Sequence, residues 1–300
     1  MLWIALGLIS SVLLGLYDVC KKHALNHNAV LPVLFFSTLF SFLPMLAVLG
    51  GMHWAPETMR HSHFYLPEAS LSQHLHLFGK SFIIFISWTL AYFAMKHLPI
   101  SIASPVRASG PVWTLIGALL LFHERPAPIQ WAGMAVVFAS YFSFSLIGRK
   151  EGVHFHRSRW ILFLFLATLI GTFSSLYDKY LFQRLDYAPM LVQFWFAFYN
   201  LLLFSLTVLL FWLPNRHKTT DFQWRWSIPL IGLLLTAADL IYFHAVRNPD
   251  ALIVVLSILR RSSVVVSFTI GSILFGDANR RMKAWALGGV LIGVILIILS

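Results

Sequence analysis

The chain has 300 residues, of which 59% are hydrophobic and only 11% are charged. Soluble domains carry about 25% charged residues, so this composition excludes an ordinary water-soluble globular protein. The formal net charge is +11, but the basic residues lie between long apolar runs, where positive charge orients a membrane protein. Nucleic acid is therefore excluded as a partner. The single cysteine, Cys20, excludes an internal disulfide and a CxxC-type metal site.

Ten apolar runs follow one another along the chain, and several are near the length of about 20 residues that crosses a bilayer. Backbone groups in hydrocarbon must be paired within their own segment, so we predict an all-α integral membrane protein with ten transmembrane helices. No basic region precedes the first run and no small-residue cleavage site follows it, so we expect a retained helix and not a signal peptide. The predicted spans are 2–20, 30–50, 77–96, 101–122, 127–147, 160–178, 189–213, 227–247, 251–275 and 284–300.

Short motifs of the first half recur in the second half in the same order. The offset between them falls from 160 to about 150 because the loop at 51–76 is about twice as long as its counterpart at 214–226. We therefore predict two related halves of five helices each, residues 1–150 and 151–300. The recurring segments are 16–18 and 176–178, 91–99 and 241–249, and 121–124 and 274–277.

An odd number of helices in each half places the second half in the membrane upside down relative to the first. The prediction is therefore an inverted-topology repeat, the arrangement that supports alternating access in many secondary transporters. A duplication kept only for packing is the alternative. Small residues in the fifth and tenth spans, Ala135, Ala139, Gly289 and Gly293, allow close helix contact inside the fold or in a homodimer.

An acidic turn closes the fourth span of each half. The residues are Leu121-Phe122-His123-Glu124 in the first half and Leu274-Phe275-Gly276-Asp277 in the second. With ten spans in two halves, these turns resemble the EamA-type transporters of the drug/metabolite transporter superfamily, whose pattern is apolar residues followed by Gly-Glu. Each turn here matches half of that pattern. The resemblance implies transport without a cofactor, not enzymatic activity, and it names no substrate.

The basic residues divide unevenly between the two sets of loops. Thirteen follow the odd-numbered spans and six follow the even-numbered spans. The positive-inside rule then places the odd loops in the cytoplasm and both termini outside, whereas the family resemblance implies that both termini lie inside. We expect a multi-pass protein of the inner or plasma membrane with its termini outside.

Charged residues within the spans mark the predicted site, because each costs roughly 2.5–3.5 kcal/mol to insert. Arg260 and Arg261 lie nine and ten residues into the ninth span, about 14–15 Å deep. We expect one of them to face a central cavity and the other to pair with a neighbouring helix. Arg107 is the repeat counterpart of Arg260, and a guanidinium grips carboxylate or phosphate with a two-point fork. Asp239 is the acidic residue of the eighth span.

The remaining candidate site residues are acidic, aromatic or histidine side chains near the same spans. Asp18 and Asp178 recur in the repeat but near span ends, where a carboxylate can simply be hydrated; Lys21 and Lys22 are ready partners for Asp18. Internal salt bridging is the alternative for the whole charged set. We assign substrate binding to Arg107, Arg260, Asp239, Tyr92, Tyr242, Trp88 and Trp113. We assign coupling or gating to Asp18, Asp178, Arg261 and His244.

Histidines crowd the loop at 51–76, and two more, His154 and His156, lie between the halves. His-x-His spacing can hold a metal, but no carboxylate or cysteine accompanies it, so we predict no metal site. The chain as a whole is predicted to be a secondary transporter for a small anionic or zwitterionic metabolite. A flippase of the same fold for lipid-linked substrates is the alternative, and a membrane-embedded enzyme lacks the nucleophile or metal cluster that it would need.

Overall fold

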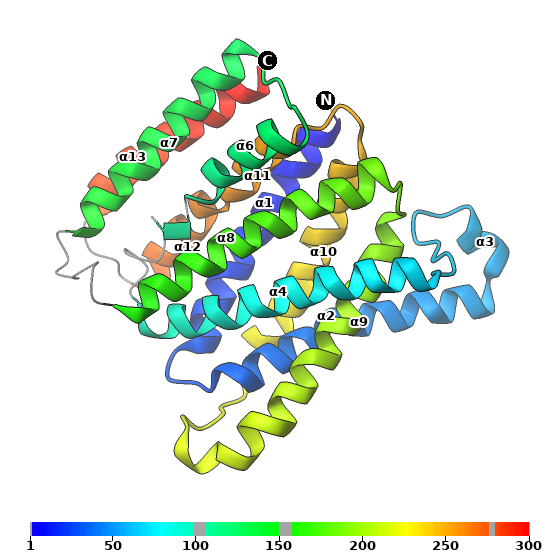
Figure 1. The fold of residues 1–300 in the computed structure, drawn as a ribbon. Helices are drawn as coiled ribbons and strands as arrows, with labels where there is room; N and C mark the ends of the chain where they lie inside the picture. The colour runs from blue at the N-terminus through cyan, green and yellow to red at the C-terminus, as the bar shows by residue number, and fades with distance from the viewer. Residues whose placement is uncertain (1, 99–105, 108, 150–157, 276–279, 300) are drawn as a thin grey trace.

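A computed structural model describes residues 2–98, 106–107, 109–149, 158–275 and 280–299, and these form a bundle of helices joined by loops (Figure 1). Helix α8 continues into the π-helical turn η1, and α9 continues into the π-helical turn η2 and the 3₁₀ turn η3. The elements are α1 (Leu2–Leu25), α2 (Val30–Trp54), α3 (Pro56–Arg60), α4 (Leu71–His97), α6 (Gly110–Leu121), α7 (Pro128–Arg149), α8 (Arg159–Lys179), η1 (Tyr180–Arg184), α9 (Pro189–Thr207), η2 (Val208–Trp212), η3 (Leu213–Lys218), α10 (Ser227–Arg247), α11 (Ile253–Arg261), α12 (Ser263–Phe275) and α13 (Arg280–Ile298).

Each predicted span coincides with a helix or a pair of helices. Six helices in the described residues are long and apolar enough to cross a membrane, and shorter apolar helices accompany them. The all-helical membrane class is thus confirmed, whereas the count of ten crossings stays a prediction. Several spans differ in detail: α1 runs to Leu25 and not to 20, α4 begins at Leu71 and not at 77, and the span at 251–275 is divided at Ser262 into α11 and α12.

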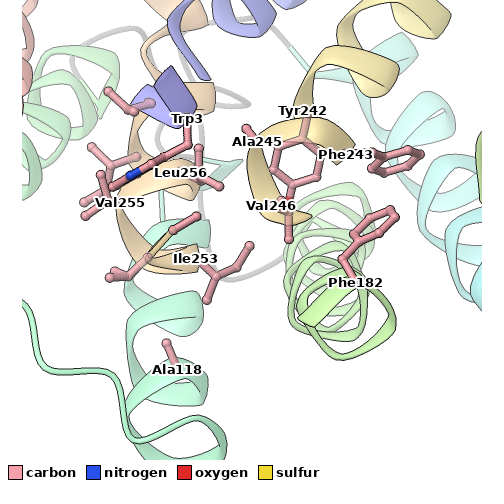
Figure 2. Packing of buried hydrophobic residues seen from close by; sticks show 14 of the residues in the cluster. Trp3, Ala118, Phe182, Tyr242, Phe243, Ala245, Val246, Ile253, Val255 and Leu256 are labelled. Atoms are coloured by element: carbon pink, nitrogen blue, oxygen red, sulfur yellow. The ribbon is translucent and has the colours of Figure 1, made fainter. Parts of the chain in front are cut away.

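The core surrounds the short helix α11, whose apolar side chains are enclosed on all sides. Ile253, Val255 and Leu256 have no exposed surface. In Figure 2 they pack near Trp3 of α1, and Tyr242 of α10 lies on the other side of the cluster. Helix α11 lies between α1, α6 and α10, and six of its nine residues are Ile, Val or Leu side chains without exposed surface.

The longer helices pack in pairs that join distant parts of the chain. Helix α1 lies along α10, α4 lies along α8, and α13 lies beside α7 (Figure 1). Glycine permits the closest approaches: a Cβ at Gly232 would lie 2.3 Å from a backbone oxygen of α2, and one at Gly293 would lie 2.7 Å from the backbone oxygen of Gly133 in α7. The small residues Gly289 and Gly293 are therefore used inside the fold, and a homodimer stays a prediction.

Candidate functional site

A cavity of about 220 Å³ lies among α1, α4, α8, α9, α10 and α11. Its wall carries five basic and three acidic side chains, a concentration of charge that apolar helices tolerate only where groups pair or face water. Apolar side chains such as Trp88, Phe196 and Leu164 complete the wall. The charged lining residues are Asp18, Lys21, Lys80, Arg107, Asp178, Asp239, Arg260 and Arg261.

The first cluster in this wall centres on Asp18 of α1. Lys21, one turn further along the same helix, donates to Oδ1 of Asp18 at 2.6 Å, and Arg107 donates to the same oxygen at 3.2 Å. The ammonium of Lys21 lies 4.3 Å from the ring centre of Tyr17. The hydroxyl of Tyr17 is hydrogen-bonded to that of Tyr92 at 3.0 Å. This Asp18 cluster therefore joins α1, α4 and the segment before α6.

The second cluster contains two ion pairs. Lys80 of α4 is paired with Asp178 of α8, and Arg260 of α11 donates to Asp239 of α10 at 2.6 Å. The Arg260 guanidinium also lies 4.0 Å from the ring centre of Tyr242, a cation–π distance. Acidic and basic groups balance in this cluster, which joins α4, α8, α10 and α11.

Arg260 and Arg261 end α11 where the helix is interrupted at Ser262. Both arginines line the cavity, so the expectation that only one of them would face it is wrong. The two side chains extend toward different helices. Arg260 contacts Asp239 of α10, whereas Nη2 of Arg261 lies next to Gly110 of α6, 3.2 Å from the position that a Cβ would take there. Two consecutive residues of one helix can therefore both line the same cavity while contacting different helices.

The structure places the aromatic candidates unequally. Trp88, Tyr92 and Tyr242 line the cavity. Trp113 does not, because it lies at 36% exposure on the outside of α6, edge-on to Phe165 at 6.0 Å. The prediction that Trp113 lines the site is therefore wrong.

His244 also lies away from the cavity. Its ring is hydrogen-bonded to the carbonyl oxygen of Leu240 at 2.8 Å and stands 5.8 Å from that of His63. Two other histidines of the 51–76 region are hydrogen-bonded to tyrosines, His74 to Tyr199 at 2.9 Å and His76 to Tyr187 at 2.7 Å. In the part of the chain that is described, no group of three potential ligands could hold a metal ion, and His154 and His156 lie outside it.

Two lysines of the cavity wall, Lys21 and Lys80, were not among the predicted site residues. Each had a signal in the sequence: Lys21 follows Asp18 by one helical turn, and Lys80 falls inside the predicted span 77–96. Asp18 and Asp178 are likewise deeper than expected, because α1 extends to Leu25 and α8 continues into η1. The prediction that these carboxylates lie near helix ends, where water could hydrate them, is wrong.

The acidic turn after α6 has a structural role. The side chain of Glu124 is 2% exposed, accepts from Nζ of Lys179 at 2.6 Å and accepts from the backbone N–H of Ile253 at 2.8 Å. A carboxylate at the first turn of α11 is favourable because unpaired N–H groups and the positive end of the helix dipole meet there. His123 precedes it with φ of 54°, a left-handed conformation that favours the glycine of the family pattern.

The second acidic turn, at Gly276 and Asp277, lies outside the described residues. The burial of Lys21, Lys80 and Lys179 removes three residues from the loop charges. Lys21 was one of the thirteen basic residues counted after odd-numbered spans, and Lys80 and Lys179 were two of the six counted after even-numbered spans. The counts therefore become twelve and four, and the excess of positive charge in the odd loops increases. The outside position of both termini stays a prediction.

A bundle of apolar helices around a cavity of buried, paired charges defines a multi-pass membrane protein. Residues 1–146 match the model of the EamA-like transporter family. This segment is just under half of the chain, and through it the family resemblance of the sequence is confirmed.

The comparisons with known proteins include one relative in sequence and one solved structure. "Uncharacterized transporter sll1319" of Synechocystis sp. is 22% identical over 173 residues. That match covers 57% of this chain and 49% of the relative, so the chain spans about half the relative's length. A solved crystal structure superposes with a TM-score of 0.71 at 17% identity over 99% of this chain and 98% of that one, which shows a shared fold.

Proposed function

We propose that the protein is a secondary transporter that moves a small anionic or zwitterionic metabolite across the inner or plasma membrane. In this proposal the helices form ten spans in two inverted halves, residues 1–150 and 151–300, with the boundary in the undescribed segment 150–157. The cavity is exposed alternately to the two sides as one half moves against the other.

Helix packing supports the inverted repeat. In the repeat, α1 corresponds to α8, α4 to α10, α2 to α9 and α7 to α13. If the halves are exchanged, the contact between α1 and α10 becomes the contact between α8 and α4. In the same way, the contact between α2 and α10 becomes the contact between α9 and α4. All four contacts are present. The pairs α2 with α9 and α7 with α13 are each converted into themselves. A twofold relation between the halves explains this pattern, which a duplication kept only for local packing does not require.

The observation that carries the proposal is the charged cavity between the halves. The pairs Arg107–Asp18 and Arg260–Asp239 use arginines at equivalent repeat positions and carboxylates at unrelated ones. Buried ion pairs contribute little net stability compared with apolar packing. Their placement around an internal space therefore favours ligand binding, with the guanidinium groups as anion ligands.

The size of the cavity favours a small solute over a lipid-linked one. A volume of about 220 Å³ is below the roughly 300–1,000 Å³ of sites for drug-sized ligands. A lipid-linked head group would need a larger space with an opening toward the acyl chains, so the flippase alternative has less support.

The test is a metabolite screen by counterflow in proteoliposomes, followed by variants of the two arginines. Arg107→Lys and Arg260→Lys keep the charge but lose the two-point fork, so we expect folded protein with impaired transport, and Arg107→Gln and Arg260→Gln should be impaired further. The exposed Arg247 provides the control Arg247→Gln, which should transport normally. If both Gln variants of the cavity arginines transport normally per folded molecule and lose only thermal stability, the arginines are structural and the proposed substrate class is withdrawn.

A further inference from the structure

We propose that Glu124 and Lys179 form a gate that closes the cavity toward one face of the bundle, and that this gate opens when the two charges separate into water. The face is the one at which α1 begins and α13 ends, next to the end of α6 and the start of α11 (Figure 1). The use of this gate in transport rests on the proposed function, whereas its opening is measurable without a solute.

The cavity is closed toward this face by buried side chains. Arg107, which precedes α6 at the opposite end of that helix, is 26% exposed, whereas the side chains of Lys80 and Asp178 are 2% and 6% exposed. The rings of Tyr242 and Phe243 line the cavity and also belong to the main core cluster. Figure 2 shows both rings among the apolar side chains of that cluster. Packed apolar groups therefore separate the cavity from the face where α1 begins.

Glu124 and Lys179 fasten this closed end. Glu124 accepts from Nζ of Lys179 at 2.6 Å and from the backbone N–H of Ile253 at 2.8 Å. Lys179 also donates to the carbonyl oxygen of Ala251 at 3.2 Å, and Gln183 donates to the same oxygen at 3.3 Å. These contacts hold the end of α6, the end of α8 and the loop before α11 together.

The contacts of Glu124 cross between the two proposed halves. Glu124 belongs to the first half, whereas Lys179 and α11 belong to the second, so separation of the halves at this face breaks the pair. The repeat that aligns Asp18 with Asp178 places Val19 opposite Lys179. A lysine needed to pack each half would recur in both, so this pair is specific to one face.

An ion pair suits a contact that must break and re-form. In the closed state the side chains of Glu124 and Lys179 are 2% and 9% exposed, and the loss of hydration offsets most of their attraction. In the open state both groups face water and are hydrated again. The closed and open states therefore lie close in free energy. Uncharged groups in their place favour the closed state, because opening no longer gains the hydration of two charges.

The test measures opening with a reporter thiol next to the gate. The native cysteine is removed by Cys20→Ser, and Ala251→Cys places a thiol at a position that is 1% exposed. The rate of labelling by a water-soluble maleimide in detergent then reports the open population. The charge-free variant Glu124→Gln/Lys179→Met keeps an acceptor for the N–H of Ile253. We expect it to fold and to label at least about 10-fold more slowly.

Two controls separate gate opening from other effects. Ala197→Cys places the thiol in the cluster between α2 and α9, where labelling reports unfolding and should be equal with and without the charged pair. Asp186→Asn/Arg247→Gln removes an exposed ion pair instead and should leave the labelling of Ala251→Cys unchanged. Equal or faster labelling of Ala251→Cys in the folded charge-free variant would overturn the gate. No labelling with the pair intact would overturn it as well, because this face would then not open.

A second variant covers the case in which the charge-free variant does not fold. Gln183→Leu removes an uncharged donor from the carbonyl oxygens of the loop before α11 and leaves the charged pair in place. It should speed the labelling of Ala251→Cys by about 3-fold or more. Unchanged labelling in this variant would refute the assignment.

The gate and the transport proposal fail in different ways. Slower labelling of the charge-free variant, with no metabolite taken up by the unaltered protein, would support the gate and refute transport. Uptake by the unaltered protein, with labelling unchanged by loss of the pair, would support transport and refute the gate. If both hold, the charge-free variant should take up solute at least about 10-fold more slowly without a lower Tm.

Discussion

The pair between Lys80 and Asp178 is the most buried ion pair of the cavity, with side chains 2% and 6% exposed. Replacing Lys80 by Met keeps most of the volume of the side chain and its contacts with Phe196 and Phe243, whose rings lie 4.8 and 5.0 Å from Nζ. The change leaves Asp178 as an unpaired buried carboxylate. Removing one partner of a buried pair costs about 3–5 kcal/mol. At about 2–4 °C per kcal/mol, the apparent Tm should fall by roughly 6–20 °C.

The assay is thermal unfolding of the purified protein in detergent, followed by intrinsic tryptophan fluorescence. The double variant Lys80→Met/Asp178→Leu removes both charges, and replacing a buried ion pair by apolar residues is often neutral or stabilising. We therefore expect it to recover most of the lost Tm. The control is Arg247→Gln, which breaks an exposed pair with Asp186 and should change stability by less than about 1 kcal/mol.

Two results would refute this reasoning. If Lys80→Met unfolds within about 2 °C of the unaltered protein, Asp178 is not left buried and charged. If the double variant is as unstable as the two single variants added together, the residues contribute independently and the pair has no coupling energy. A double variant with recovered stability but without transport would assign the pair to function.

Four further changes test the fold and the site. Glu124→Gln keeps an acceptor for the N–H groups of α11 but leaves the buried ammonium of Lys179 without a counter-charge. The free energy of unfolding should therefore fall by about 3–5 kcal/mol, and a fall below about 1 kcal/mol would exclude the buried pair. His123→Gly relieves a left-handed conformation and should raise stability by about 1 kcal/mol in the same assay; a lower Tm would contradict that. Gly232→Ala forces a side chain into the backbone of α2 and should lower expression and Tm, whereas Gly79→Ala, with nothing within 4 Å, should not. Asp239→Asn removes the carboxylate partner of Arg260 and should abolish uptake per folded molecule in proteoliposomes, and uptake unchanged at every pH would remove Asp239 from the mechanism.

The sequence by itself determined the class of the protein and the positions of its helices. Hydropathy is a property of consecutive residues, and a backbone in hydrocarbon must satisfy its hydrogen bonds locally. The apolar runs therefore predicted the helices to within a few residues at most ends, α10 at 227–247 included. The high cost of charge in hydrocarbon likewise drew attention to Arg107, Arg260 and Asp239, all three of which line the cavity.

Only the tertiary structure decided which of these residues meet. Lys80 and Asp178 are 98 positions apart, and Glu124 and Lys179 are 55 apart. Their pairing depends on how far each helix is rotated about its axis and on which helix lies beside it. The same rotation turns Trp113 outward. From the sequence alone, a lysine at the end of an apolar run is interpreted as a loop charge. Whether it is buried depends on a carboxylate from another helix, and the local sequence does not specify that partner.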